Sequence, residues 1–255
     1  FATYLRKRGQ SVGIIDAPAF DLSPQEVATI ICDVYDPLLI VLVVYGFQPS
    51  ASTQNMGAAG ETARAIKELR PDLKIMMTGT HPAALPRRTL MEEKVDFVCS
   101  GEGPRTIAQT VVMLEGKRDD YELVPGLYYR RGGMILNTAP ADLLPDLDDA
   151  MPGAAWDLLP IYRYRAHNWH SFELIDRRSP YASIHTSLGC PYRCNFCCIN
   201  APFGKSSYRM WSPATVGKEL QYLTDTYGVR HVKFVDEMFV LNRAHVLGVC
   251  DEITK

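Results

Sequence analysis

Short apolar runs alternate with amphipathic segments through the first half of this 255-residue chain. The longest run, residues 38–45, has the length and the β-branched content of a buried parallel strand. Two further runs are residues 74–78, followed by Gly79, and residues 97–99, followed by Ser100 and Gly101; a helix-like segment comes after each. Because strands and helices alternate with short connections, we expect an α/β fold: a Rossmann-like, doubly wound parallel sheet with helices on both faces.

The expected ligand-binding edge of this sheet is rich in glycine and hydroxyl side chains. Ligands of open parallel sheets bind beyond the carboxyl ends of the strands. Here those ends carry residues 46–53, 79–81 and 101–103. Glycine lets the backbone approach a flat ligand, and hydroxyl groups can bond its polar edges. A nucleotide-binding sheet would show the same features, so the pattern indicates a ligand edge without naming the ligand.

The second half of the chain contains three closely spaced cysteines. Cys190, Cys194 and Cys197 form a C-x₃-C-x₂-C triplet after residues 182–187, which have the pattern of a strand. Thiolates gathered in one loop suit an iron–sulfur cluster, and a four-iron cluster normally takes four cysteines. Three cysteines would leave one iron open to bind a small molecule.

Two other interpretations of these cysteines are weaker. A structural zinc site would usually pair two C-x₂-C units or add histidines at fixed spacing, and no second pair follows. A disulfide framework is disfavoured because the cysteines are few for the length of the chain. Cys198 should project away from Cys197, so we interpret it as a structural or bystander thiol.

The triplet, with Phe196 just before its last cysteine, resembles the signature of the radical S-adenosylmethionine (radical SAM) superfamily. The resemblance implies that Cys190, Cys194 and Cys197 hold a [4Fe-4S] cluster. In that family SAM chelates the open iron, and an electron from the cluster cleaves it to methionine and a 5′-deoxyadenosyl radical.

Three further residues are implied as SAM contacts by the same resemblance. Phe196 is one of them. The pair Asp236-Glu237 stands where the family places a Gly-Gly-Glu-like motif that binds the SAM amino group, although an acidic residue replaces the glycines here. A helix-capping role for the acidic pair is the alternative.

Two stretches are similar to the radical SAM subgroup with an N-terminal cobalamin-binding domain. One is residues 187–211. The other is Gly-x-His-Pro at residues 79–82, followed by Asp-Phe-Val-x-x-Gly-Glu-Gly at residues 96–103. The resemblance implies that cobalamin is bound by Ser52, Thr53, Gly79, Thr80, Gly101, Glu102 and Gly103. A sheet without the cofactor is the alternative. His81 does not match the family's cobalt-ligating histidine, so we interpret it as a loop residue that lines the site.

The domain organisation that this resemblance implies has three parts. Residues 1–140 would be the cobalamin-binding domain without its first strand, and residues 141–180 a Pro/Asp-rich linker. Residues 181–255 would be the first units of a radical SAM partial (β/α)₆ barrel. Because the chain begins at Phe1 and stops early in the barrel, we expect it to be one piece of a longer protein.

The composition of the chain indicates whether it binds nucleic acid, whether it spans a membrane and in which compartment it lies. Twenty-seven basic and 29 acidic residues give a formal net charge of −2, which argues against a nucleic-acid-binding surface. No run of about 18 apolar residues exists, so no membrane span is expected. The seven cysteines are mostly far apart in sequence, which indicates a reducing compartment such as the cytoplasm.

The resemblance implies a cobalamin-dependent radical SAM enzyme that methylates an unactivated carbon of a small molecule or natural product. Flavodoxin or ferredoxin would be the electron donor. One alternative is a cyclase or rearrangement enzyme with the same cofactors but without methyl transfer. Another is a non-catalytic cobalamin and iron–sulfur binding module. We expect the 255-residue chain by itself to be inactive, because much of the barrel would be missing.

Overall fold

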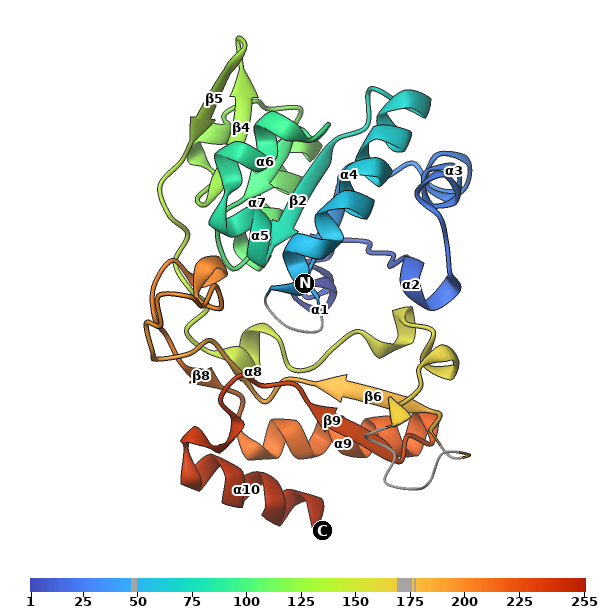
Figure 1. The fold of residues 1–255 in the computed structure, drawn as a ribbon, viewed down its shortest axis with the longest axis vertical. Helices are drawn as coiled ribbons and strands as arrows, with labels where there is room; N and C mark the ends of the chain where they lie inside the picture. The colour runs from blue at the N-terminus through green and yellow to red at the C-terminus, as the bar shows by residue number, and fades with distance from the viewer. Residues whose placement is uncertain (47–49, 169–175, 177) are drawn as a thin grey trace. The chain divides into compact units, whose positions relative to one another are not determined.

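The computed structural model describes residues 1–46, 50–168, 176 and 178–255. The chain divides into two compact units (Figure 1). The sheet unit is formed by Leu22–Leu143 with Tyr192–Ser206, and the β6–β9 unit by Phe1–Asp21, Leu144–Pro191 and Ser207–Lys255. The domain division near residues 140 and 180 stays a prediction. Residues 47–49 of the predicted ligand edge, and 169–175 and 177 of the predicted linker, lie outside the described residues.

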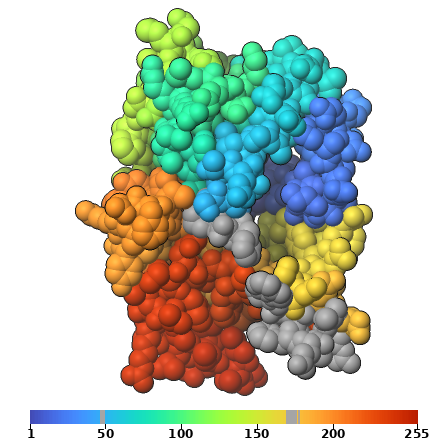
Figure 2. Space-filling model, viewed as in Figure 1, coloured from blue at the N-terminus to red at the C-terminus, as the bar shows by residue number. Residues whose placement is uncertain are grey.

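A five-stranded mixed sheet organises the sheet unit. Its order is β1-β2-β3-β4-β5. The strands are β1 (Ile40–Val44), β2 (Ile75–Gly79), β3 (Phe97–Cys99), β4 (Leu127–Arg131) and β5 (Met134–Asn137). The first three are parallel, as expected. The hairpin of β4 and β5, which the Gly132-Gly133 turn predicts, extends the same sheet in antiparallel fashion. The tip of this hairpin projects from the unit, as Figures 1 and 2 show.

The helices of this unit follow the expected alternation. They are α3 (Pro24–Val34), α4 (Ala51–Leu69), α5 (Thr80–Ala84), α6 (Pro86–Glu92) and α7 (Pro104–Glu115), with the 3₁₀ helix η1 (Tyr121–Leu123) before the hairpin. Ser23 and Glu26 form the capping box of α3 that the Ser-x-x-Glu spacing predicts. α4 begins earlier than expected, so Ser52 and Thr53 lie in its first turn instead of in a loop.

Two sequence expectations about strands are corrected. β1 is a sheet edge among the described strands, and Val43 is 52% exposed, so β1 is not the fully buried strand that its composition suggested. Residues 11–16, whose short apolar run has the sequence pattern of a strand, pair with none of the described strands. A single strand is not stable without a neighbour that satisfies its backbone groups.

Strand β2, the middle one of the three parallel strands, carries the core of the sheet unit. Ile75, Met76 and Met77 are fully buried, and Leu90 and Val98 from the adjacent elements are equally inaccessible. Burying side chains of this size stabilises a domain by about 1.5–3 kcal/mol each. The carboxyl end of β2 is thus attached to the most rigid part of this unit.

The β6–β9 unit contains a parallel strand pair with two helices. β6 (Tyr181–Ile184) pairs with β9 (His231–Phe234), and α9 (Pro213–Tyr227) connects them in sequence. α10 (Arg243–Ile253) follows β9, which confirms the two expected β/α units. The shorter elements are α1 (Ala2–Arg6), α2 (Ala17–Phe20), α8 (Leu147–Ala150), η2 (Trp156–Leu158), η3 (Ile161–Arg163), β7 (Ser187–Leu188), β8 (Arg209–Met210) and η7 (Phe239–Leu241).

The core of this unit gathers residues from its separate segments. Trp156 and Ile161 pack with Ile184, Leu223 and Val249. Glu219 also accepts hydrogen bonds from the Trp156 indole nitrogen, at 2.8 Å, and from a backbone N–H nearby, at 2.9 Å. Across the described parts of both units, no helix has the length and apolar character that a membrane span requires.

Candidate functional site: a glycine-rich sheet edge and a cysteine loop

The carboxyl end of β2 is held tightly against β1. Gly79 has φ of +136°, and it is paired with Val44 in the parallel ladder. A Cβ atom at Gly79 would lie 2.1 Å from the Val44 carbonyl oxygen. Only glycine fits such a position, so Gly79 serves the close approach of the two strands.

The hydroxyl of Ser52 forms its hydrogen bonds within the protein, at the same end of β1 and β2. It is 1% exposed, and its hydroxyl donates to the Val44 carbonyl and accepts from the His81 backbone N–H at 2.9 Å. These bonds join the end of β1, the start of α4 and the start of α5. Ser52 therefore positions the loops of the predicted cobalamin edge and has no hydroxyl proton left to donate to a ligand.

Thr53 and His81 form the accessible part of this edge. The Thr53 hydroxyl lies 3.0 Å from His81 Nδ1. Burial, followed in size by the nearby Arg88 charge, lowers the pKa of His81, so its ring is neutral at pH 7. A neutral imidazole next to a hydroxyl is a polar lining that can donate to, or accept from, a ligand.

Buried polar groups lie near the ends of β2 and β3. Thr80 is 2% exposed and Glu102 is 8% exposed. The Thr78 hydroxyl lies near the Cys99 thiol, but among the described residues no group has hydrogen-bond geometry toward it. Because Thr78 is 0% exposed, the polar side chains of this edge that a ligand can reach are those of Thr53 and His81.

The three cysteines of the triplet fall in different environments. Cys190 belongs to the β6–β9 unit and is buried, whereas Cys194 and Cys197 belong to the sheet unit and are exposed. A turn links the last two, with the Cys197 N–H donating to the Cys194 carbonyl at 3.1 Å. Within the part of the chain that the structure describes, no three His, Cys, Asp or Glu side chains are grouped to hold a metal ion.

The ligand assignment of the three cysteines therefore stays a prediction. The donor set fits the cluster, because all three are free thiols in one loop and thiolates are the usual ligands of such clusters. Gly189, just before Cys190, also has a positive φ, +84°. A Cβ there would lie 2.5 Å from the Ser207 carbonyl oxygen, so glycine is required at the entry of the loop.

The segment that carries Cys194 and Cys197 packs on the predicted cobalamin edge within the sheet unit. Its 3₁₀ helix η6 (Ala201–Phe203) contacts α5, the short helix that begins at the end of β2. Figure 2 shows the orange residues near position 200 against green residues of the same unit. Arg193 Nε donates to Ser206 Oγ at 2.8 Å, which ties the two ends of the segment together.

The acidic pair at the end of β9 divides into a buried and an exposed carboxylate. Asp236 Oδ1 accepts from the Thr186 N–H and the Thr186 hydroxyl, both at 2.9 Å, and from the Ser187 hydroxyl at 2.6 Å. Asp236 Oδ2 is inaccessible, and no described residue bonds to it. Glu237 is exposed, and desolvation together with the Asp236 charge raises its pKa. Phe196 is 89% exposed.

Sequence reasoning missed two members of this network. Thr186 is fully buried, and its hydroxyl lies 2.8 Å from His245 Nε2 on α10. His245 is 59 residues farther along the chain than Thr186. Nothing in the sequence pattern of α10 marks this histidine as a residue of the network. Only the burial of both side chains against the end of β9 reveals the connection.

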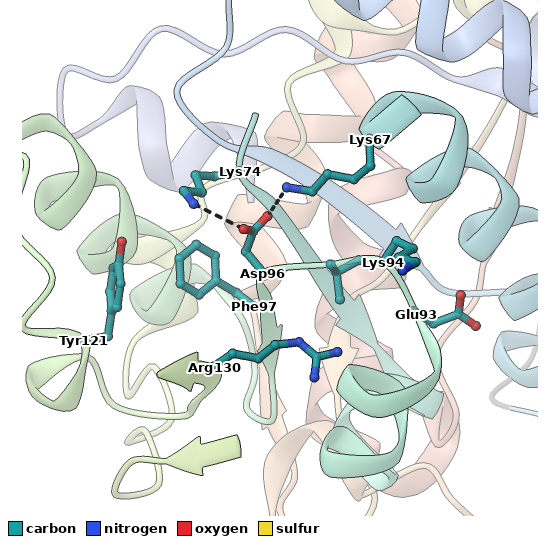
Figure 3. Close-up of a pocket in the computed structure, with 9 residues that line it drawn as sticks. Lys67, Lys74, Glu93, Lys94, Asp96, Phe97, Tyr121 and Arg130 are labelled. Carbon is teal, nitrogen blue, oxygen red and sulfur yellow. Dashed lines mark hydrogen bonds and ion pairs between the residues drawn. The ribbon is translucent and has the colours of Figure 1, made fainter. Parts of the chain in front are cut away.

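A pocket of about 410 Å³ lies at the opposite, amino-terminal edge of the sheet (Figure 3). Its wall includes Asp96, which accepts from Lys67 at 2.8 Å, from Lys74 at 3.3 Å and from the Ile75 N–H at 2.9 Å. Lys74 directly precedes β2, and Asp96 directly precedes β3. These bonds connect the starts of two strands, so they have a structural role away from the ligand edge.

Comparison with known proteins supports the assignment of the first domain. The model of the B12 binding domain matches residues 1–111. An uncharacterized methyltransferase of Pyrococcus horikoshii is 30% identical over 239 residues, which are 93% of this chain and 48% of that protein. An anaerobic magnesium-protoporphyrin IX monomethyl ester cyclase of Synechocystis sp. is 27% identical over 246 residues, 96% of this chain and 45% of the cyclase. The chain spans about half the length of these curated relatives.

The fold also matches a solved structure. The radical SAM methyltransferase TsrM from Kitasatospora setae, solved with tryptophan substrate and a SAM analogue, has a TM-score of 0.71 at 22% identity. The match covers 99% of this chain and 46% of TsrM. The sequence match thus defines a B12 binding domain, and the likeness to TsrM shows the α/β fold of the chain. Residues 1–111 of the chain match a B12 binding domain, and the curated relatives include a methyltransferase and a cyclase.

Proposed function

We propose that this chain is the cofactor-binding part of a cobalamin-dependent radical SAM methyltransferase. The enzyme would cleave SAM reductively and methylate an unactivated carbon of a small molecule or natural product. The observation that carries the proposal is the packing of η6 on α5 within the sheet unit. Through that contact, the turn with Cys194 and Cys197 belongs to the same compact unit as the predicted cobalamin edge.

The residues of the sheet edge have separable roles in this proposal. Thr53, Thr80, Gly101, Glu102 and Gly103 would bind cobalamin. Ser52 and Gly79, whose contacts are internal, would hold the loops in place. The polar lining formed by Thr53 and His81 supports a ligand with hydrogen-bonding groups.

The cysteine loop and the acidic pair would serve the second half of the site. Cys190, Cys194 and Cys197 would hold the [4Fe-4S] cluster, and Phe196 and the Asp236-Glu237 pair would contact SAM. When bound, the cluster and cobalamin supply reductive cleavage of SAM and methyl transfer, respectively. The protein orients these groups and excludes water from them.

The proposal includes a partner and a compartment. A one-electron donor protein such as flavodoxin or ferredoxin would reduce the cluster. The seven cysteines are mostly far apart in sequence, which supports a reducing compartment such as the cytoplasm.

Anaerobic reconstitution of the chain with iron and sulfide tests the cluster assignment. We expect about four irons and four sulfides per chain, because the site should hold a four-iron cluster. Cys190→Ala, Cys194→Ala and Cys197→Ala should each lose most of the iron. Cys250→Ala, at an exposed position on α10, is the matched control and should keep it. Full iron in Cys194→Ala, or stoichiometric zinc in the parent, would contradict the assignment.

Cobalamin binding is tested separately with hydroxocobalamin and the same chain. We expect one cobalamin to be retained through gel filtration, with a visible spectrum distinct from that of the free cofactor. A bulky substitution at the edge, Thr80→Trp, should abolish retention because Thr80 is buried there. Substitution of an exposed helix residue, Gln54→Trp, provides the control. If no cobalamin is retained by the parent, the proposal fails.

A second candidate function is a cyclisation or rearrangement without methyl transfer, which the similarity to the Synechocystis cyclase favours. Full-length protein can be incubated with methyl-labelled SAM and a small-molecule extract. Label in a component of the extract supports methylation, whereas deoxyadenosine without label transfer supports rearrangement. A reconstituted protein that holds both cofactors but does not bind SAM would favour a non-catalytic module.

A further inference from the structure

A buried hydrogen-bonded chain links α10 to the start of the cysteine loop. Thr186 is fully buried and His245 is 5% exposed. The Thr186 oxygen lies 2.8 Å from His245 Nε2 and 2.9 Å from Asp236 Oδ1. The three side chains come from the end of β6, the end of β9 and the first turn of α10, all within the β6–β9 unit.

The direction of these bonds follows from counting protons. Asp236 Oδ1 also receives the Thr186 N–H, which can only donate, so Oδ1 is an acceptor. The single hydroxyl proton of Thr186 therefore points to Asp236. The same hydroxyl must then accept from His245, and His245 carries a proton on Nε2. The order of donation is His245 to Thr186 to Asp236.

This chain leaves one oxygen of Asp236 for another group. Oδ1 receives three donors, including the Ser187 hydroxyl at 2.6 Å. Oδ2 is buried without a bonding partner among the described residues. An ionised carboxylate oxygen in such a place is costly unless a donor or a cation meets it. An ammonium group is a ligand that provides both.

The same bonds fix the backbone that leads into the cluster site. Thr186 and Ser187 directly precede Leu188-Gly189-Cys190. Both donate to Asp236, so the carboxylate and the entry of the cysteine loop are held as one body. A substitution of His245 would therefore alter the position of the Asp236 carboxylate and of the entry to the cysteine loop, because Thr186 bonds to His245 and to Asp236.

We propose that His245 is a positioning residue for SAM binding, because through Thr186 it fixes Asp236 and leaves Oδ2, to which no described residue bonds, as the acceptor for the ammonium group of the ligand. The inference rests on the proposed function only for the identity of the ligand. The hydrogen-bonded chain itself is a property of the protein without cofactors. His245 touches neither the ligand nor the cluster and acts through Thr186.

Nuclear magnetic resonance of the metal-free protein, labelled with ¹⁵N in histidine, tests directly whether the hydrogen-bonded chain exists. The His245 signals, assigned by their loss in His245→Gln, should show the Nε2–H tautomer. Thr186→Val, which keeps the shape and removes the hydroxyl, should shift the Nε2 signal. An Nδ1–H tautomer in the parent, or His245 signals that stay unchanged in Thr186→Val, would show that the hydrogen-bonded chain from His245 to Asp236 does not exist.

Affinity for SAM in the reconstituted protein tests the positioning role. A glutamine amide can replace the Nε2–H of histidine, whereas the shorter asparagine amide does not reach Thr186. We expect the Kd of His245→Gln to stay within about threefold of the parent, and that of His245→Asn to rise about tenfold, a difference of about 1.4 kcal/mol. Circular dichroism establishes that both variants are folded.

The outcomes separate the two proposals. Equal Kd values in the asparagine and glutamine variants overturn the positioning role, whatever the tautomer. If neither the parent nor any variant binds SAM, the proposed function and the SAM part of this inference both fail. The tautomer then still decides whether the hydrogen-bonded chain exists.

Discussion

Replacing Gly79 with alanine should destabilise the sheet unit strongly. Gly79 ends β2 at φ +136° and ψ −177°, in a region of backbone space open almost only to glycine. A Cβ there would lie 2.1 Å from the Val44 carbonyl oxygen and 2.6 Å from the carbonyl carbon. Both atoms belong to the backbone of β1, which is paired to Gly79, so neither can move without opening the ladder.

The expected loss is about 3 kcal/mol in the free energy of unfolding. A non-glycine residue held in this region costs about 1–3 kcal/mol. Displacing the end of β1 would also weaken its hydrogen bonds, each contributing about 1 kcal/mol. For urea, where the free energy changes by about 2–3 kcal/mol per molar for a unit of this size, the midpoint should fall by about 1 M.

Urea unfolding followed by two signals measures this effect. Far-ultraviolet circular dichroism reports the helices and strands of both units. Tryptophan fluorescence reports the β6–β9 unit, because Trp156 and Trp211 belong to it and Trp169 falls in the same stretch of sequence. Two units need not unfold together, so the signals are analysed separately. We expect Gly79→Ala to shift the dichroism transition more than the fluorescence transition.

Gly101→Ala is the matched control at the same edge. Its Cβ would meet only the Ala141 Cβ at 3.5 Å, an ordinary contact, and Gly101 lies outside the positive-φ region. We expect its unfolding free energy to stay within about 0.5 kcal/mol of the parent. If Gly79→Ala unfolds at the parent midpoint, or if both variants lose stability equally, the backbone argument is refuted.

Three further predictions address other parts of the chain. Gly57→Ala should raise the free energy of unfolding by about 0.5–1 kcal/mol, because Gly57 is exposed inside α4 with open space at its Cβ; a lower thermal midpoint would argue against it. Glu219→Ala should cost about 1–3 kcal/mol by leaving the buried Trp156 indole N–H unpaired, whereas Glu219→Gln keeps an acceptor; urea titration followed by fluorescence compares the two. Burial lowers the pKa of His245 below its usual 6.5, so the unfolded state binds more protons in the window below that value. Stability should be full above pH 6.5 and fall as the pH drops toward the folded-state pKa, and His245→Gln should flatten this dependence in urea titrations at several pH values.

Local features of the chain were predictable because they depend on residues close in sequence. The capping box of Ser23 and Glu26 marks the start of α3, and the hairpin after residue 126 forms where the turn residues place it. The alternation of strands and helices gave the α/β class. The three cysteines were likewise identified as a ligand set by their spacing and by the chemistry of thiolates.

The sequence by itself thus determined the kinds of elements, their order and the chemistry of the cysteine loop. Only the tertiary structure decided that Ser52 turns inward to the Val44 carbonyl, that η6 packs on α5, and that His245 reaches Asp236 through Thr186. Two of these features, the contact of η6 with α5 and the bond between Thr186 and His245, join segments far apart in the chain, and the Ser52 bond depends on how α4 packs against β1. Periodicity and spacing describe only near neighbours, whereas burial and hydrogen bonding between distant segments depend on how the whole unit packs.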